Sequence, residues 1–185
     1  MRMKTMLITG GARGIGAQMV HHFAAQGWRV MFCYQSSQEK AEALARETGA
    51  QAVRCDVRDE AQVRAMLAQA MASLRHLDAL ICNAAAAWTG LTEEMPLTEY
   101  QRICDTNLRG AFLCTREALP HLRDTRGGIV LISSMWGLVG ASCETVYSAT
   151  KAALQCMARS LAKEVGPSGV RVNCVAPGAV DTDMM

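Results

Sequence analysis

Three polar side chains in the second half of the chain have the types and the spacing that proton transfer requires. Tyr147 and Lys151 lie four residues apart, and Ser134 ends an apolar run upstream of them. A phenol has a pKa near ~10, so on its own it is a poor proton donor and acceptor at neutral pH. An ammonium within roughly 4–6 Å lowers that pKa, and an i, i+4 spacing on a helix supplies such a distance. We therefore expect Tyr147 to exchange a proton with a carbonyl substrate beside Lys151.

The same residues also have an ordinary structural explanation. Tyr and Lys at i, i+4 occur on ordinary helix surfaces, and Ser133 with Ser134 would also suit a polar strand end. The combination favours chemistry, because Ser134 follows the apolar run 129–132. The carboxyl ends of parallel strands are where α/β sheets bind ligands.

A glycine-rich turn follows the first apolar run of the chain. It reads Thr9-Gly10-Gly11-Ala12-Arg13-Gly14-Ile15-Gly16. Glycines allow a tight turn and let backbone N–H groups and the next helix N-terminus approach a pyrophosphate. The spacing differs from the commonest dinucleotide motif, Gly-x-Gly-x-x-Gly, and glycines between a strand and a helix also make plain turns. Its place directly after the first predicted strand favours nucleotide binding.

The residues after the second predicted strand indicate which nicotinamide cofactor this turn would hold. An acid there bonds the ribose 2′-hydroxyl of NAD and repels a 2′-phosphate. The stretch Cys33-Tyr34-Gln35-Ser36-Ser37 has no acid, and Arg13 can pair with a phosphate. The alternative is that Arg13 is solvated and that Ser36 or Ser37 caps the next helix. We predict NADPH over NADH.

Alternating short and long segments predict the fold that positions these residues. Runs rich in Val, Ile and Leu alternate with segments of helical period, which is typical of repeated βαβ units. Predicted strands lie near 4–9, 29–34, 51–55, 78–83, 128–133 and 170–175, and predicted helices near 14–26, 38–48, 59–74, 98–123 and 145–165. This rhythm predicts a doubly wound, Rossmann-type α/β fold with a parallel sheet, strand order 3-2-1-4-5-6 and helices on both faces. Residues 84–97 are predicted as a loop at the carboxyl edge of the fourth strand.

Length and charge exclude several other classes of protein. The chain has 185 residues, of which 50% are hydrophobic, and a formal net charge of +2. That length suits one domain, and scattered Lys and Arg argue against nucleic acid or a membrane surface as a partner. The N-terminal apolar run is too brief for a signal peptide or a membrane span, so we expect a cytoplasmic protein.

The cysteines and histidines give no sign of a disulfide framework or a metal site. Most of the eight cysteines lie in apolar runs, and no Cys-x-x-Cys occurs, so buried free thiols are expected. A reducing compartment keeps such thiols free. The four histidines lack a second ligand at a suitable spacing, and no metal site is predicted.

With these motifs in place, the chain resembles the short-chain dehydrogenase/reductase family over essentially its whole length. Thr9, Gly10, Gly14 and Gly16 match the Thr-Gly-x-x-x-Gly-x-Gly turn of that family, and Ser134, Tyr147 and Lys151 match its Ser followed by Tyr-x-x-x-Lys. Further matching positions are Asp56, Val57, Asn107, Pro177, Gly178 and Thr182. The family segment Asn-Asn-Ala-Gly reads Cys82-Asn83-Ala84-Ala85 here, so backbone contacts to the cofactor ribose are expected with a changed local geometry.

The resemblance implies a role for each matched residue. Tyr147 would protonate the carbonyl oxygen as hydride arrives, while Lys151 would lower the pKa of Tyr147 and hold the nicotinamide ribose. Ser134 would donate a hydrogen bond to the substrate oxygen, and Asn107 would help anchor a water chain that reprotonates Tyr147. Beyond the glycine turn, the cofactor would contact Tyr34, Ser36, Asp56, Val57, Asn83, Ala84, Ala85, Tyr147, Lys151, Pro177, Gly178, Val180 and Thr182.

The resemblance leaves the substrate open. The overall pattern is similar to 3-oxoacyl-[acyl-carrier-protein] reductases of fatty acid biosynthesis, which reduce a β-ketoacyl thioester with NADPH. The segment SSMWGLVGASCETVYS is similar to elongation-factor-P 5-aminopentanone reductases, which reduce a ketone on a modified lysine. Trp136 is a candidate substrate contact beside Ser134 and Tyr147, although Trp136 and Cys143 would also suit simple packing. A sensor or scaffold that binds NADP(H) without turnover is the alternative from another class, and the intact Ser134, Tyr147 and Lys151 argue against it.

The resemblance also bears on assembly and on the C-terminal end. The helices predicted near 98–123 and 145–165 resemble those that form dimer contacts in the family, so a homodimer or homotetramer is expected. Members usually continue beyond Thr182 with a helical lid and a seventh strand. Because the sequence stops at Met185, we expect residues 1–185 to be a single NADP-binding domain that is incomplete at its C-terminal end.

Overall fold

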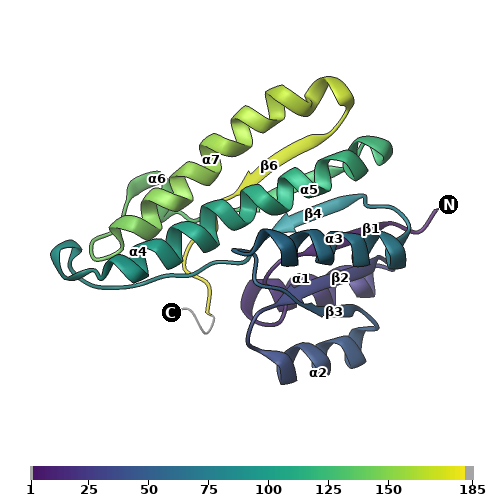
Figure 1. Cartoon of the computed structure of the whole chain (residues 1–185), viewed down its shortest axis with the longest axis horizontal. Coiled ribbons are helices and arrows are strands. Elements are labelled where there is room, and N and C mark those ends of the chain that lie inside the picture. Colours follow the sequence, from purple (N-terminus) through teal and green to yellow (C-terminus); the bar gives the residue numbers. More distant parts are fainter. Residues whose placement is uncertain (1, 182–185) are drawn as a thin grey trace.

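One parallel sheet organises the computed structural model, which describes residues 2–181 (Figure 1). Its strand order is β3-β2-β1-β4-β5-β6. The strands are β1 (Thr5–Ile8), β2 (Arg29–Tyr34), β3 (Gln51–Arg54), β4 (Ala79–Cys82), β5 (Gly128–Ile132) and β6 (Arg171–Val175). All five neighbouring pairs are parallel. The predicted fold class and strand order are confirmed, and each predicted strand is present to within one residue at either end.

Helices connect the strands. The α-helices are α1 (Gly14–Ala25), α2 (Gln38–Thr48), α3 (Glu60–Leu74), α4 (Leu97–Cys104), α5 (Gly110–Thr125), α6 (Trp136–Val139) and α7 (Thr145–Val165). Two short 3₁₀ turns, η1 (Thr92–Glu94) and η3 (Gly166–Ser168), also occur. Within residues 2–181, none of these helices combines the length and the apolar composition that crossing a bilayer takes.

The long helix predicted near 98–123 is not regular. A π-helical segment, η2 (Asp105–Arg109), separates α4 from α5. Extra residues of this kind are rare inside helices and often occur at functional sites. Here the wider turn contains Asn107, which is only 1% exposed and faces the interior. The helix predicted near 98–123 is confirmed as an unbroken helical run, but its π-helical turn was not predicted, because the hydrophobic period does not register a single inserted residue.

Alternate residues of the central strands belong to two hydrophobic cores. In β1, Leu7 belongs to a core shared with α3, α5 and α7, whereas Met6 and Ile8 belong to a core shared with α1 and α2. Successive side chains on a strand point to opposite faces of a sheet, which produces this division. Helices therefore cover both faces of the sheet, as predicted (Figure 1).

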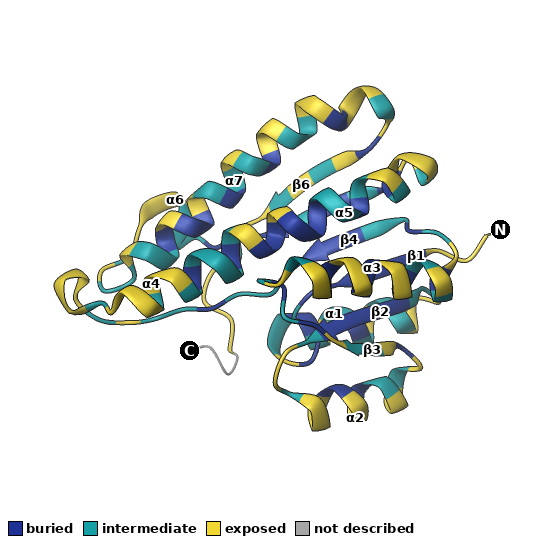
Figure 2. Cartoon of the chain, in the orientation of Figure 1, coloured by how far each residue is buried: buried dark blue, intermediate teal, exposed yellow. Residues whose placement is uncertain are grey.

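Burial falls from the centre of the sheet to its edges. All four residues of β1 are buried, while the residues of β6 alternate between exposed and half-buried (Figure 2). The strand order reverses between β1 and β4, at the well-packed centre. In open α/β sheets, ligands bind in the crevice at that switch point, outside the carboxyl ends of the strands.

The cysteines only partly follow the expectation of buried thiols. All eight are free, and Cys33, Cys55, Cys82 and Cys114 are buried. Cys104, Cys143 and Cys174 are half-buried, and Cys156 is exposed. The apolar context was misleading for Cys156 because α7 has a solvent-exposed face.

Candidate active site

The glycine turn between β1 and α1 is packed too tightly for larger side chains. A Cβ atom on Gly16 would collide with the carbonyl oxygen of Gly10 and lie 2.7 Å from Asn83 Nδ2. A Cβ atom on Gly11 would lie 2.5 Å from Phe32 Cβ. Gly10 itself has a φ of 65°, in the left-handed region that favours glycine. The turn therefore presents backbone and the N-terminus of α1, which together suit a phosphate group.

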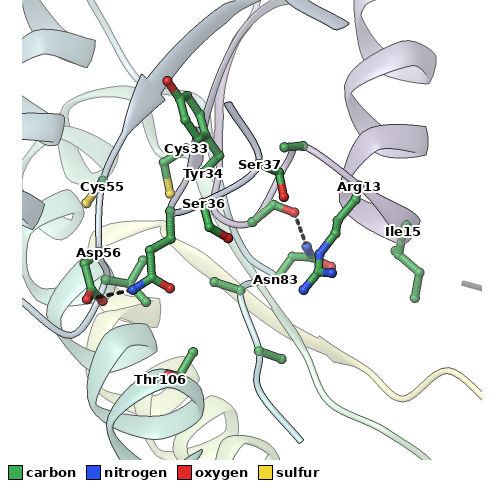
Figure 3. A pocket seen from close by; sticks show the side chains of 17 residues that line it. Arg13, Ile15, Cys33, Tyr34, Ser36, Ser37, Cys55, Asp56, Asn83 and Thr106 are labelled. Carbon is green, nitrogen blue, oxygen red and sulfur yellow. Dashed lines mark hydrogen bonds between the residues drawn. The ribbon is translucent and has the colours of Figure 1, made fainter. Parts of the chain in front are cut away.

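Asn83, directly after β4, locks this turn in place. Its side-chain amide donates a hydrogen bond to Gly10 O at 2.9 Å (Figure 3) and another to Thr9 O at 3.2 Å. In return, Thr9 Oγ1 accepts hydrogen bonds from the backbone N–H groups of Asn83 and Ala84 at 3.0 and 3.1 Å. The departure at Cys82 and Ala85 thus leaves the link between β4 and the glycine turn intact.

A cavity opens beside the turn, at the carboxyl ends of the first four strands (Figure 3). Of the predicted cofactor contacts, Gly10, Ala12, Arg13, Gly14, Ile15, Tyr34, Ser36, Asp56, Val57, Asn83, Ala84 and Ala85 line it. Gly11 and Gly16 pack beneath the turn and do not line the cavity. Cys33, Gln35, Ser37, Cys55 and Thr106 complete the wall. We call this space the nucleotide cavity.

Charges in the nucleotide cavity differ in whether they have partners. The Asp56 carboxylate accepts hydrogen bonds from the Arg58 guanidinium at 2.6–3.0 Å and from Gln35 Nε2 at 2.9 Å. The hydrogen bond from Arg58 is the main cause that lowers the pKa of Asp56. Arg13 also points into the cavity and has no ion pair within residues 2–181 (Figure 3). Ser37 precedes α2 but makes no side-chain capping hydrogen bond, contrary to the capping alternative.

A second cavity adjoins the first and contains the three polar residues from which the prediction began. Ile15, Asn83 and Ala85 line both spaces. The second space, which we call the catalytic cavity, is also lined by the predicted residues Ser134, Trp136, Tyr147, Lys151, Pro177, Gly178 and Val180. Thr182 lies outside the described residues. The fold thus brings the ends of β4 and β5 and the first turns of α7 to one place.

Burial controls proton affinity in the catalytic cavity. Lys151 is only 2% exposed, and this burial lowers the pKa of its ammonium to about 8. Lys151 Nζ lies 5.5 Å from the centre of the Tyr147 ring and donates a hydrogen bond to Ile132 O at 2.8 Å. Burial also raises the pKa of Tyr147, while a hydrogen bond from Ser134 lowers it and the charge of Glu144 raises it.

The overall lowering of the Tyr147 pKa that was expected is therefore not found: the pKa is raised, and burial is the largest cause. The penalty of placing a phenolate in a half-buried position exceeds the effect of the hydrogen bond from Ser134. A phenol that keeps its proton is ready to act as an acid. Ser134 Oγ accepts a hydrogen bond from Trp136 N at 3.2 Å, which leaves its own hydrogen to donate.

Asn107 takes part in this site only through other groups. Its Oδ1 accepts from Ala86 N at 2.7 Å, and its Nδ2 donates to Ala86 O and to Thr150 Oγ1, both at 3.0 Å. The side chain lines neither cavity. It ties the π-helical segment to the loop after β4 and to α7, and its role in a water chain stays a prediction.

Two pairs of groups anchor the loop after β4 to the segment before α7. Gly90 N donates to Cys143 O at 2.9 Å, and the hydroxyls of Thr92 and Thr145 lie 2.9 Å apart. Cys143 has a φ of 62°, which is uncommon for a residue with a side chain. The predicted loop is therefore held at the rim of the catalytic cavity.

Glu144 lines the catalytic cavity and was missed by sequence reasoning. It precedes α7 without making a side-chain capping bond, and it has no ion pair within residues 2–181. An acid three residues before Tyr147 was the available signal. Its direction could not be read from the sequence, because an acid at a helix start ordinarily caps the helix.

Comparisons with known proteins agree with this geometry. A family model described as short chain dehydrogenase matches residues 4–185. The 3-oxoacyl-[acyl-carrier-protein] reductase FabG of Staphylococcus aureus is 37% identical over 187 residues, covering 98% of this chain and 76% of the relative.

Solved structures extend the similarity to three dimensions. The 3-ketoacyl-(acyl-carrier-protein) reductase of Brucella melitensis complexed with NADH has a TM-score of 0.94 at 29% identity, covering 98% of this chain and 78% of that one. A blue fluorescent protein from a metagenomic library, in complex with NADPH, has a TM-score of 0.93 at 38% identity, covering 98% of this chain and 76% of that one. The chain therefore belongs to the short-chain dehydrogenase family and is an oxidoreductase of CH–OH or C=O groups that uses a nicotinamide cofactor.

Proposed function

We propose that this chain is an NADPH-dependent carbonyl reductase, with residues 1–185 acting as one NADP-binding domain, and that its substrate is a 3-oxoacyl thioester. The observation that carries the proposal is the continuity of the two cavities. Ile15, Asn83 and Ala85 border both spaces, so a nucleotide that enters one reaches Tyr147 and Lys151 in the other. When bound, the nicotinamide supplies the hydride.

The preference for NADPH rests on the unpaired cation in the nucleotide cavity. Arg13 has no carboxylate partner within residues 2–181, and Ser36 and Ser37 line the wall beside it. A guanidinium and two hydroxyls suit a 2′-phosphate. The nearest acid in that cavity, Asp56, is neutralised by Arg58.

The proton steps follow from the positions of three side chains. The Tyr147 phenol transfers its proton to the carbonyl oxygen, and Ser134 donates a hydrogen bond to the same oxygen while charge develops there. Lys151 then faces the phenolate with a positive charge and stabilises it. Thr150, held by Asn107, keeps this part of α7 in register with the loop after β4.

The 3-oxoacyl substrate is supported by the relative in Staphylococcus aureus, whose name states a 3-oxoacyl group on an acyl-carrier protein. A carrier-bound thioester would enter beside Trp136 and Met135, which form part of the wall of the catalytic cavity. Such a substrate would make an acyl carrier the transient partner of this chain, with no nucleic acid or membrane involved.

Glu144 favours a second candidate, the 5-aminopentanone that is carried on elongation factor P. Its carboxylate lines the catalytic cavity without a cationic partner in the part of the chain that the structure describes. A half-buried carboxylate attracts an ammonium, and a 5-aminopentanone carries one. A 3-oxoacyl group offers no such charge.

Assembly and location are part of the same proposal. Leu97, Tyr100 and Phe112 on α4 and α5 are 68%, 46% and 50% exposed. Large apolar side chains that gather on one surface mark protein–protein contacts. We expect α4, α5 and α7 to form the interface of a homodimer or homotetramer in the cytoplasm.

A rate comparison tests the proposed function. NADPH oxidation is followed by its absorbance with acetoacetyl thioesters, and separately with elongation factor P that carries 5-aminopentanone. A higher kcat/KM with the thioester supports the first candidate, and a higher value with the modified factor supports the second. A lower KM for NADH than for NADPH would contradict the cofactor proposal. Tight NADPH binding without oxidation over both substrates would favour a sensor instead.

A further inference from the structure

Gln155 lies one helical turn beyond Lys151, outside every catalytic motif of the sequence. Its Nε2 donates a hydrogen bond to Ser133 Oγ at 2.9 Å. Ser133 is only 3% exposed and in turn donates from Oγ to the backbone oxygen of Lys151 at 2.8 Å. Ser133, at the end of β5, is therefore bonded to α7 twice, through Gln155 and through Lys151.

The ammonium of Lys151 makes a further hydrogen bond between α7 and β5. Lys151 Nζ donates to Ile132 O at 2.8 Å, so Lys151 is bonded through both its ends to two consecutive residues at the end of β5. The next residue after Ser133 is Ser134, which lines the catalytic cavity. Any shift of Ser133 would therefore move Ser134 and Lys151 relative to each other.

Gln155 also touches the short helix that carries the wall of the cavity. A Cβ atom on Gly137 of α6 would lie 2.8 Å from Gln155 Nε2 and 2.7 Å from the carbonyl carbon of Lys151. The amide of Gln155 thus occupies the junction of β5, α6 and α7. Ser134 follows β5, while Trp136 and Tyr147 lie on α6 and α7.

We propose that Gln155 is a positioning residue that sets the separation of Ser134, Tyr147 and Lys151 through Ser133. The inference rests on the proposed reductase activity. Gln155 lines neither cavity, so it touches neither nucleotide nor ketone. Loss of its hydrogen bond leaves the buried Ser133 Oγ with one partner fewer and frees β5 to move against α7. Small displacements of reacting groups cost large factors in rate.

The test replaces Gln155 by Met, which keeps the length of the side chain and removes the donor. We expect kcat to fall about tenfold, because the groups lose part of their alignment. The Kd for NADPH should stay within about twofold, because the glycine turn and Asn83 are untouched. Gln18→Met is the matched control, since Gln18 is an exposed residue of α1. That control should leave both kcat and Kd unchanged.

A double-mutant cycle with Ser133→Ala separates positioning from general packing. If the two side chains act as one unit, the double variant loses no more rate than the single variants do. Additive losses in kcat, or a normal kcat with only a lower Tm, would overturn the proposal. Gln155→Glu keeps the length and lacks the donor, so it decides the question if Gln155→Met does not fold.

A second readout does not depend on turnover. Labelling of Lys151 by acetic anhydride, mapped by mass spectrometry, should become several times faster in Gln155→Met and stay unchanged in Gln18→Met. Unchanged labelling of Lys151 would overturn the positioning role. Absence of NADPH oxidation in the wild-type protein, together with faster labelling in Gln155→Met, would instead refute the proposed function and leave the positioning role standing.

Discussion

The nucleotide cavity and the catalytic cavity share three lining residues, but one is shaped by backbone and the other by side chains. The nucleotide cavity is shaped by a turn in which glycines are required, because a Cβ atom at Gly11 or Gly16 would meet neighbouring atoms. The catalytic cavity depends on side chains that are held by hydrogen bonds, such as Lys151 on Ile132 O. A change in the first should therefore alter affinity and stability, whereas a change in the second should alter rate.

The carboxylates of the two cavities differ in whether they are paired. In the nucleotide cavity, Asp56 is paired with Arg58 at 2.6 Å. In the catalytic cavity, the ammonium of Lys151 has only a backbone carbonyl oxygen as its hydrogen-bond partner within residues 2–181, and Glu144 has no ion pair there. Buried charges without counter-charges cost stability but respond strongly to a ligand. The unpaired charges of the catalytic cavity therefore lower the stability of the fold but remain available to a ligand.

The largest effect is expected for Tyr147→Phe, which removes the proton donor and keeps the ring. We predict that kcat falls by about 10²–10⁴-fold, the range that general acid catalysis provides. The Kd for NADPH, measured by fluorescence titration, should change little because the nucleotide cavity is intact. A kcat near that of the wild-type protein would contradict the assignment of rate to the catalytic cavity.

The pH dependence of stability is the next largest effect. Lys151 has a pKa of about 8 when folded, below its ordinary value of 10.5. Between these two values the unfolded chain holds a proton that the folded chain has lost, so the contribution of Lys151 to stability rises with pH. The free energy of unfolding, relative to Lys151→Met, should increase by up to about 3 kcal/mol from pH 8 to 10.5. Denaturant unfolding of both proteins measures it, and a difference that does not change with pH would contradict the burial of this charge.

A glycine substitution tests the nucleotide side. Gly16→Ala should destabilise the fold by about 1–3 kcal/mol and weaken NADPH binding, because the new methyl group meets the Gly10 carbonyl. Gly166→Ala is the matched control, since Gly166 has a φ of −52° and a Cβ atom there would have no neighbour within 4 Å. Thermal unfolding and NADPH titration compare the two. Equal Tm values would show that the turn tolerates side chains.

Arg13→Ala tests the role of the unpaired cation in the nucleotide cavity. We expect the Kd for NADPH to rise about tenfold, which corresponds to about 1.4 kcal/mol, because the 2′-phosphate loses a charged partner. The Kd for NADH should not change. A similar loss for both cofactors, measured by titration, would assign Arg13 to the pyrophosphate rather than to the 2′-phosphate.

The smallest effect concerns Glu144→Gln. The negative charge of Glu144 raises the pKa of Tyr147, so its removal should lower that pKa. Because reduction needs the protonated phenol, the loss of kcat at alkaline pH should begin at a lower pH in the variant. A pH–rate profile measures this shift, and a shift in the opposite direction would contradict the role given to Glu144.

The sequence predicted the strands well because the central ones are buried on both faces and read as continuous apolar runs. It also predicted Ser134, Tyr147 and Lys151 as neighbours, because carboxyl ends of parallel strands meet at one edge of a sheet. It missed α6, a four-residue helix that is too short to show a period. The π-helical segment around Asn107 was missed for a related reason, since one added residue leaves the apolar pattern almost unchanged.

The sequence did not reveal the residues whose role depends on where their side chains point. Glu144 directly precedes α7 and lines the catalytic cavity, whereas Gln155 lies on α7 and contacts Ser133. The sign of the Tyr147 pKa shift also depends on burial, which spacing alone does not give. Pairwise spacing predicts proximity, whereas the balance of burial, hydrogen bonds and charge needs three-dimensional structure.

The central claim is that this chain transfers hydride from NADPH to a ketone beside Tyr147. The most direct measurement incubates the wild-type protein with NADPH that carries deuterium at both positions of the nicotinamide C4, and with an acetoacetyl thioester or 5-aminopentanone-modified elongation factor P. We predict that mass spectrometry finds one deuterium on the new carbinol carbon, and that Tyr147→Phe transfers almost none. Bound NADPH with no deuterium in the product of either ketone would contradict the claim.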